Sequence, residues 1–133
     1  MTAATTLLVD GANVVGSRPT GWWRDRAGAG ADLVARLRAA TTAGTLAAPV
    51  VVVLEGSARA GAPEGEAGGV AVVHAPGSGD DTLVGWTETT PGPVTLVSAD
   101  RQLRERCRAR GASAVGPGWL LARLGPPDPG TGR

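Results

Sequence analysis

The sequence predicts a three-layer α/β domain with a mainly parallel sheet. Short apolar runs alternate with longer segments of helical periodicity, which favours right-handed βαβ units. Residues 50–54 read Val-Val-Val-Val-Leu, an apolar run on both faces that suits a parallel sheet covered by helices on both sides. The 133 residues suffice for one domain with a hydrophobic core, but not for two. We assign this domain to residues 1–124.

The first half of the chain contains two expected strands and one helix. Residues 6–9 form a short apolar run, typical of a buried strand. Apolar residues recur at helical spacing through 25–42, which predicts a helix with one buried face. The second strand is expected at 50–54. Residues 56–69 are rich in Gly and Ala and have no apolar period, so we expect a surface loop, or a flap that becomes ordered on substrate.

The second half continues the alternation. Apolar runs predict three further strands, and Gly111 is a C-cap signal for the helix that precedes it. The Pro- and Gly-rich residues 125–133 indicate a disordered tail. In chain order, these elements are a strand at 70–73, a helix at 80–89, a strand at 94–97, a helix at 100–110, a strand at 112–115 and a helix at 117–124.

Composition excludes several classes of protein. The formal net charge of +1 gives no indication of a partner. A single cysteine, Cys107, excludes an intrachain disulfide and a multi-cysteine zinc site. No apolar stretch approaches the ~18 residues that a membrane span needs. We therefore expect a soluble cytoplasmic protein that makes no membrane contact.

Three segments place carboxylates at one edge of the predicted sheet. Asp10 ends the first strand, Asp80 and Asp81 open the helix before the fourth strand, and Asp100 follows that strand. Sites in open α/β sheets form outside the carboxyl ends of the strands. Neighbouring strands run ~4.8 Å apart, so Asp10 and Asp100 can reach one metal ion if their strands are adjacent. Taken singly, each acid is also explained as a turn or helix-capping residue.

The grouping of these acids favours Mg²⁺ or Mn²⁺ as a cofactor. Like charges repel unless a cation lies between them, and oxygen ligands with retained waters suit hard ions. The sequence lacks the His and Cys ligands that zinc prefers. Glu55 ends the second strand and is a candidate outer-shell residue. The candidate metal ligands are Asp10, Asp80, Asp81 and Asp100.

Two polar residues lie beside these acids. The amide of Asn13 either holds a water or phosphate oxygen or caps the loop after the first strand. Ser98 either hydrogen-bonds Asp100 or the phosphate, or has a structural role, and we place it in the outer shell with Glu55. The candidate catalytic residues are Asp10, Asp80, Asp100 and Asn13.

Arginine clusters near the acids indicate a polyanionic substrate. Residues 101–110 hold five Arg side chains against one acid, Glu105. Such a helix is often only a solvated face, but this one starts at the proposed metal site, which favours phosphate positioning. Trp22 either stacks on an unpaired base or packs beneath its loop. The candidate RNA-binding residues are Arg18, Arg24, Arg26, Arg101, Arg104 and Trp22.

Four motifs together resemble the YacP-like NYN domains, a group of PIN-like ribonucleases. Residues 9–16, Val-Asp-Gly-Ala-Asn-Val-Val-Gly, are similar to the opening of these domains, and 51–56 to their second strand with its acidic end. Residues 79–83 resemble the segment in which an Asp opens a helix, and 97–100 the last acidic strand end. The order and spacing of the motifs are specific, and the resemblance extends to about Leu124.

The resemblance implies a parallel sheet of order 3-2-1-4-5, with the first and fourth strands adjacent. It also implies metal-dependent cleavage of RNA that leaves 5′-phosphate and 3′-hydroxyl ends. By position, the metal-site acids are Asp10, Asp80 and Asp100, and Asp81 and Glu55 are their helpers.

This chain departs from the family pattern at three positions. Ala12 stands where the family usually has Tyr, and Glu55 is longer than the common Asp. Ala99 separates Ser98 from Asp100, where the family often has Ser and Asp in direct succession. The last departure bears on the reach of Asp100.

The sequence therefore predicts a metal-dependent endoribonuclease that hydrolyses RNA phosphodiester bonds with a carboxylate-bound Mg²⁺ or Mn²⁺ ion. One alternative is a non-catalytic RNA-binding module of the same fold that acts on a ribosome or another RNA–protein complex. Another is a small-molecule α/β domain in which the acids only cap helices.

Overall fold

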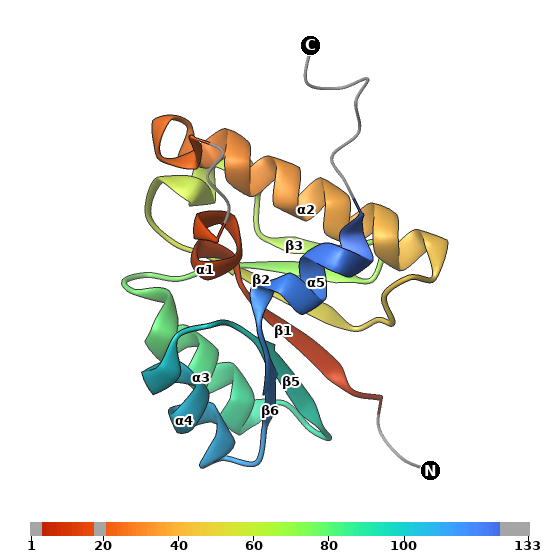
Figure 1. Cartoon of the computed structure of the whole chain (residues 1–133), viewed down its shortest axis with the longest axis vertical. Helices are drawn as coiled ribbons and strands as arrows, with labels where there is room; N and C mark the ends of the chain where they lie inside the picture. Colours follow the sequence, from red (N-terminus) through yellow and green to blue (C-terminus); the bar gives the residue numbers. More distant parts are fainter. Residues whose placement is uncertain (1–3, 18–20, 126–133) are drawn as a thin grey trace.

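A central sheet organises the computed structural model, which describes residues 4–17 and 21–125 (Figure 1). The sheet has six strands in the order β3-β4-β2-β1-β5-β6. All neighbouring strands are parallel except β3, which pairs antiparallel with β4. The strands are β1 (Thr6–Asp10), β2 (Val50–Leu54), β3 (Gly65–Ala67), β4 (Val70–His74), β5 (Val94–Val97) and β6 (Ser113–Val115).

Helices cover both faces of the sheet, as the apolar runs predict (Figure 1). Alternate residues of β2 enter different cores: Val52 and Leu54 pack with α1, α2 and α5, whereas Val51 and Val53 pack with α3 and α4. The helices are α1 (Gly11–Gly16), α2 (Arg26–Ala43), α3 (Gly79–Thr89), α4 (Arg101–Arg108) and α5 (Pro117–Leu124), with short 3₁₀ helices η1 (Trp22–Arg24) and η2 (Gly56–Gly61).

The predicted fold class is confirmed. The five expected strands lie in the expected order, since β4-β2-β1-β5-β6 corresponds to 3-2-1-4-5 in the count made from the sequence. Four elements were not predicted: α1, which begins directly after β1, the short edge strand β3, and the 3₁₀ helices η1 and η2. α4 is shorter than the expected helix at 100–110, because Asp100 is its N-cap and residues 109–111 form a turn.

The segment 56–69, expected to be a surface loop or a flap, contains η2 and β3. η2 packs against α2, and a Cβ on Gly61 would lie 2.1 Å from the carbonyl oxygen of Ala27. Gly68 and Gly69 have φ values of +61° and +80° and form the turn between β3 and β4. The glycines of this segment therefore allow η2 to pack closely against α2 and allow a tight turn between β3 and β4.

The expected tail at 125–133 lies outside the described residues except for Gly125, whose carbonyl oxygen accepts a hydrogen bond from Arg36 of α2. In the part of the chain that the structure describes, no helix is long and apolar enough to cross a bilayer.

Candidate metal and active site

Asp10 lies at the centre of the candidate site. It is the last residue of β1 and is only 6% exposed. Because Val9 pairs with Val97 across the parallel β1–β5 ladder, Asp10 and Ser98 follow at the same level. The Ser98 hydroxyl donates to Asp10 Oδ2 at 2.9 Å, and the backbone N–H of Asn13 donates to Oδ1 at 3.3 Å. Both carboxylate oxygens are thus held in a fixed orientation.

Ser98 and Asn13 also join β1 to the connection between β5 and α4. Ser98 Oγ accepts a hydrogen bond from the backbone N–H of Asp100 at 3.1 Å. Asn13 Oδ1 accepts one from the backbone N–H of Ala99 at 2.8 Å. The structure therefore favours a positioning role for both side chains, and the outer-shell placement of Ser98 agrees with its bond to Asp10.

Gly11 permits α1 to start immediately after Asp10. A Cβ at this position would lie 2.6 Å from the carbonyl oxygen of Val53, so only glycine fits between β1 and β2. Asp10 then serves as the N-cap of α1.

We expect Gly11→Ala to destabilise the fold by about 1–3 kcal/mol, since the added methyl group must displace backbone atoms of β2. Urea denaturation measures this change. Gly85→Ala is the matched control: Gly85 lies within α3 with open space around its Cα, and the substitution is expected to be neutral or stabilising. Equal effects of the two substitutions would contradict the close contact at Gly11.

Negative charge accumulates around Asp10. Burial raises the pKa of Asp10 from 3.8 to about 6; the hydrogen bonds from Ser98 and Asn13 oppose this rise, and the charges of Asp80 and Glu55 add to it. Burial also raises the pKa of Asp80, and the charge of Asp100 raises it further. Four carboxylates therefore interact at one edge of the sheet. We call Asp10, Glu55, Asp80 and Asp100 the acidic cluster.

The other three members of the acidic cluster come from two further strand ends and from the start of a helix. Glu55 follows β2, and its side chain lies against the start of α3. A Cβ added to Gly79 would be 2.9 Å from Glu55 Oε1. Asp80 is in the first turn of α3, whose N-cap is Ser78. Asp100 caps α4, and its Oδ1 accepts the backbone N–H of Leu103 at 3.0 Å.

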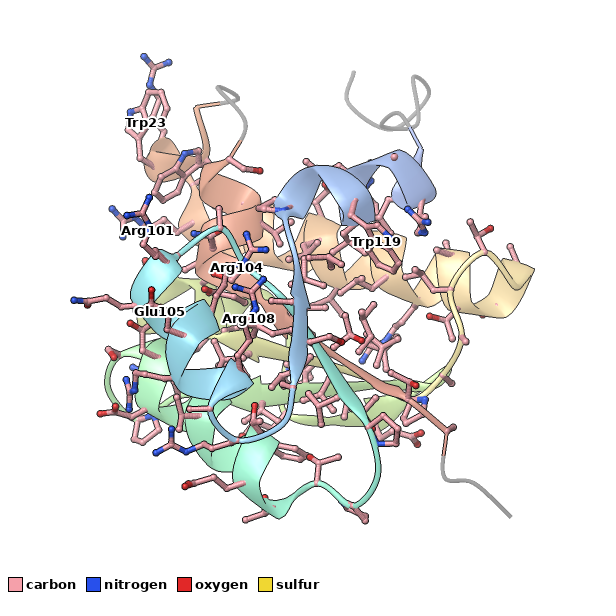
Figure 2. The ribbon with its side chains drawn as sticks, turned by 60° about the horizontal axis from the view of Figure 1, so that its bottom comes forward. Trp23, Arg101, Arg104, Glu105, Arg108 and Trp119 are labelled. Atoms are coloured by element: carbon pink, nitrogen blue, oxygen red, sulfur yellow. The ribbon has the colours of Figure 1, made fainter. Side chains whose placement is uncertain are left out.

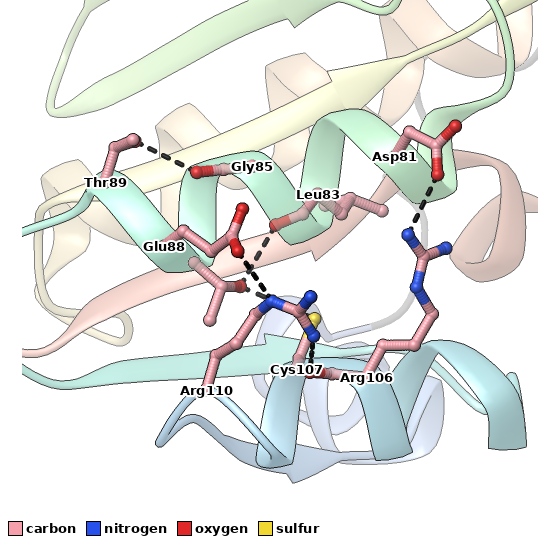
Figure 3. Close-up of polar contacts among 9 residues, drawn as sticks. Asp81, Leu83, Gly85, Glu88, Thr89, Arg106, Cys107 and Arg110 are labelled. Atoms are coloured by element: carbon pink, nitrogen blue, oxygen red, sulfur yellow. Dashed lines mark hydrogen bonds and ion pairs between the residues drawn. The ribbon is translucent and has the colours of Figure 1, made fainter.

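The structure does not bring Asp81 to the acidic cluster, contrary to its prediction as a metal ligand. Its side chain is 84% exposed and accepts a hydrogen bond at 2.9 Å from Arg106 of α4 (Figure 3). Successive helical residues point in different directions, so Asp80 and Asp81 cannot both face the same site.

The acidic cluster offers carboxylate oxygens, the kind of ligand that hard cations such as Mg²⁺ prefer. Neither of the described ion pairs, Arg106–Asp81 and Arg110–Glu88, includes a member of the acidic cluster, although the charge of Arg106 lowers the pKa of Asp80. Among the described residues, no group of three or more His, Cys, Asp or Glu side chains is arranged to hold an ion. This excludes a closed cage, but Mg²⁺ commonly binds through one or two carboxylates and retains water.

A pocket of about 150 Å³ is lined in part by the first residues of α1, which follow Asp10. Trp22 and Arg26 form one side, with the Arg26 guanidinium carbon 5.2 Å from the centre of a Trp22 ring. The pocket is lined by Gly11, Ala12, Val15, Trp22, Arg26, Gly30, Leu54, Glu55, Gly56 and Ala58. Of the acidic cluster, only Glu55 lines this pocket together with Trp22 and Arg26.

The remaining candidates of this segment lie elsewhere or are not described. Trp23 is 53% exposed, and the Arg24 guanidinium carbon lies 5.8 Å from its ring, away from the lining of the pocket. Arg18 lies outside the described residues.

The arginines of α4 and of the turn that follows it form two groups. Arg106 and Arg110 form ion pairs with Asp81 and Glu88 of α3 (Figure 3). The other face carries an open depression, which we call the basic groove, lined by Ala99, Arg101, Arg104, Glu105 and Arg108 (Figure 2). Arg108 was not among the candidates, although its spacing from Arg101 and Arg104 places the three on one helical face.

No family model and no curated protein sequence matches this chain. Among solved structures, it is similar to the crystal structure of Rae1 (YacP) from Bacillus subtilis, determined as the W164L mutant. The TM-score is 0.65, and the match covers 91% of this chain and 75% of that one at 17% sequence identity. The chain therefore has a YacP-like fold, as its sequence motifs predict.

Proposed function

We propose that this protein is a metal-dependent endoribonuclease. The observation that carries the proposal is the buried Asp10 carboxylate, which shares one edge of a parallel sheet with Glu55, Asp80 and Asp100 and has no described basic partner. The YacP-like fold supports it, since the sequence motifs resemble ribonucleases with that fold. Oxygen donors grouped in this way suit Mg²⁺ or Mn²⁺.

Some side chains would hold the ion, and others would position the substrate. Asp10, Asp80 and Asp100 would hold the ion, with Glu55 as an outer-shell residue. The chemistry supplied by a bound Mg²⁺ or Mn²⁺ ion is acidification of the attacking water and neutralisation of charge on the phosphate oxygens. Ser98 and Asn13 keep the Asp10 carboxylate oriented. The basic groove begins next to Ala99, where it can bind RNA phosphates close to the acids.

A labelled single-stranded RNA tests this function. We expect internal cleavage with Mn²⁺ or Mg²⁺, products with 5′-phosphate ends, and no cleavage in EDTA. Cleavage that persists in EDTA would contradict the proposed mechanism, because the acidic cluster offers no metal-free route to an activated water.

A non-catalytic RNA-binding module, acting on a ribosome or another RNA–protein complex, is the second candidate. It is favoured by the lack of a three-ligand metal group among the described residues. The same assay separates the two functions, since salt-sensitive RNA binding without cleavage at any divalent-ion concentration would support the second.

The basic groove predicts a difference between arginines of one helix. Arg104→Ala and Arg108→Ala are each expected to weaken RNA binding and to reduce the slope of log K against log salt by about 1. Arg106→Ala is the matched control, because its guanidinium is already paired with Asp81. Fluorescence anisotropy of a labelled RNA between about 50 and 200 mM salt measures both quantities. Equal losses in all three variants would remove the distinction between the two faces of α4.

A further inference from the structure

The residues expected to bind RNA form two groups on opposite faces of the sheet (Figure 1). Trp22 and Arg26 belong to η1 and to the start of α2, and α2 packs on the face of the sheet that carries Val9 and Leu54. The basic groove belongs to α4, which packs on the other face through Leu103. A strand that contacts both groups must therefore pass from one face of the sheet to the other.

The first group lies one short helix away from the acidic cluster. The Trp22 ring packs on the end of α1, because a Cβ added to Gly16 would lie 3.5 Å from Trp22 Cζ2. α1 has six residues and begins directly after Asp10, so its two ends are about 9 Å apart. The Arg26 guanidinium carbon lies 5.2 Å from the centre of a Trp22 ring. This group therefore offers an aromatic plane and a positive charge together.

The second group starts at the acidic cluster and leads away from it along α4. Ala99, which lines the basic groove, directly precedes Asp100, and Arg101 directly follows it. Arg104 and Arg108 continue the row one and two turns further along the helix (Figure 2). From Arg101 to Arg108 the row is about 10 Å long, which is enough to contact more than one phosphate of a strand.

The acidic cluster lies between the two groups. Asp10 ends β1, and α1 leads from it to the surface on which Trp22 packs. On the other side, Ser98 Oγ bonds to both the Asp10 carboxylate and the backbone N–H of Asp100, which joins Asp10 to the connection into α4. A phosphate bound at the acidic cluster therefore has one RNA-binding group on each side of it.

We propose that one RNA strand crosses the carboxyl edge of the sheet at the acidic cluster. Nucleotides on one side of the cleaved bond bind at Trp22 and Arg26, and nucleotides on the other side bind in the basic groove. The proposal rests on the proposed ribonuclease function and specifies its substrate. That substrate extends on both sides of the cleaved bond and is unpaired where it reaches Trp22, because only an unpaired base can stack on the indole.

Photo-crosslinking in EDTA tests the path of the strand without cleavage. An RNA of about eight nucleotides, within the range of single-strand binding sites, carries 4-thiouridine at its 5′ end or at its 3′ end. We expect one probe to attach to residues 21–30 and the other to residues 99–110, as identified by mass spectrometry of the digested protein. Attachment of both probes to the same segment, or of each probe to both segments, would overturn the proposed path.

Cleavage then assigns each group to one side of the bond. A substrate with one fixed cleaved bond is shortened from its 5′ end or its 3′ end, and kcat/KM is measured for each length. Shortening from either end should lower kcat/KM of the wild type. Trp22→Leu should lower kcat/KM of the longest substrate about tenfold and remove the dependence on length at one end only. Arg104→Ala should reduce the dependence at the other end only.

Two further variants complete this test. Arg110→Ala is the matched control for Arg104→Ala, because its guanidinium is paired with Glu88, and it should keep the dependence at both ends. Arg26→Ala replaces Trp22→Leu if that variant does not fold, since Arg26 is exposed.

The kinetic result that contradicts the proposal is an effect of Trp22→Leu and Arg104→Ala at the same end, or an equal loss at all substrate lengths. The two experiments also separate this proposal from the ribonuclease function. If the probes attach to the two segments in EDTA but no metal supports cleavage, the ribonuclease proposal fails and the path of the strand stands.

Discussion

Asp10→Asn is expected to abolish RNA cleavage while making the metal-free fold more stable at neutral pH. Cleavage is lost because a neutral amide is a poor ligand for Mg²⁺ or Mn²⁺ and no longer supplies the central charge of the acidic cluster. Since removing outer-shell partners of a metal site already costs about 10- to 100-fold, we expect at least about a 100-fold loss of the cleavage rate.

The gain in stability follows from the pKa of Asp10. Folding raises the pKa of Asp10 from 3.8 to about 6. Between these pH values, Asp10 is therefore protonated more often in the folded metal-free state than in the unfolded state. The contribution of Asp10 to stability therefore falls as pH rises through this window and is fully lost above it. The shift corresponds to about 2–3 kcal/mol.

Part of this gain is offset in the variant, because an amide cannot accept from both the Ser98 hydroxyl and the backbone N–H of Asn13 as the carboxylate does. We therefore expect Asp10→Asn to be more stable than wild type by about 1 kcal/mol at pH 7.5. The difference should disappear or reverse near pH 4. Urea unfolding in EDTA at both pH values measures it.

Asp81→Asn is the matched control for the cleavage assay. Asp81 is adjacent to Asp80 in sequence but exposed and paired with Arg106, so this variant should cleave at the wild-type rate. An Asp10→Asn protein that cleaves as fast as wild type, or an Asp81→Asn protein that is inactive, would reject the assignment of the acidic cluster.

The topology was predictable because it depends on local pattern. The run at 50–54 is apolar on both faces, which requires helices on both sides, and the alternation of strands and helices then leaves few arrangements. The convergence of Asp10, Asp80 and Asp100 followed from the same rule, since the carboxyl ends of parallel strands share one edge.

The direction of individual side chains was not predictable from this pattern. Two adjacent acids open α3, and only the rotation of the helix decides that Asp80 joins the acidic cluster while Asp81 pairs with Arg106. The same holds for α4, where the alignment with α3 decides which arginines are paired.

Segments of small residues were misread for a different reason. In 56–69, Gly61 is needed because the backbone of α2 passes close to it, and this requirement becomes visible only in the folded structure.

The hydrogen bonds of Ser98 and Asn13 were not predictable for another reason. They depend on the register of β1 against β5, which strand order alone does not fix.

Mn²⁺ or Mg²⁺ is expected to stabilise the wild-type fold, because the acidic cluster exists only when the three strand ends and α3 are assembled. A ligand that binds the folded state alone adds about 2.7 kcal/mol at 100 times its Kd, which is several degrees in melting temperature for a domain of this size. The rise in melting temperature should be large at pH 7.5 and small at pH 5. At pH values below about 6, the pKa of Asp10, the ion must displace the proton of this carboxyl group.

Asp10→Asn separates binding at the acidic cluster from binding elsewhere. This variant should melt at the same temperature with and without the divalent ion, in buffers matched for ionic strength, whereas Asp81→Asn should respond as wild type does. A divalent-ion shift of equal size in Asp10→Asn would place the ion at other carboxylates. It would then leave Asp10 as a buried acid whose raised pKa costs stability without a cation to offset it, and the case for metal-dependent cleavage would lose its main support.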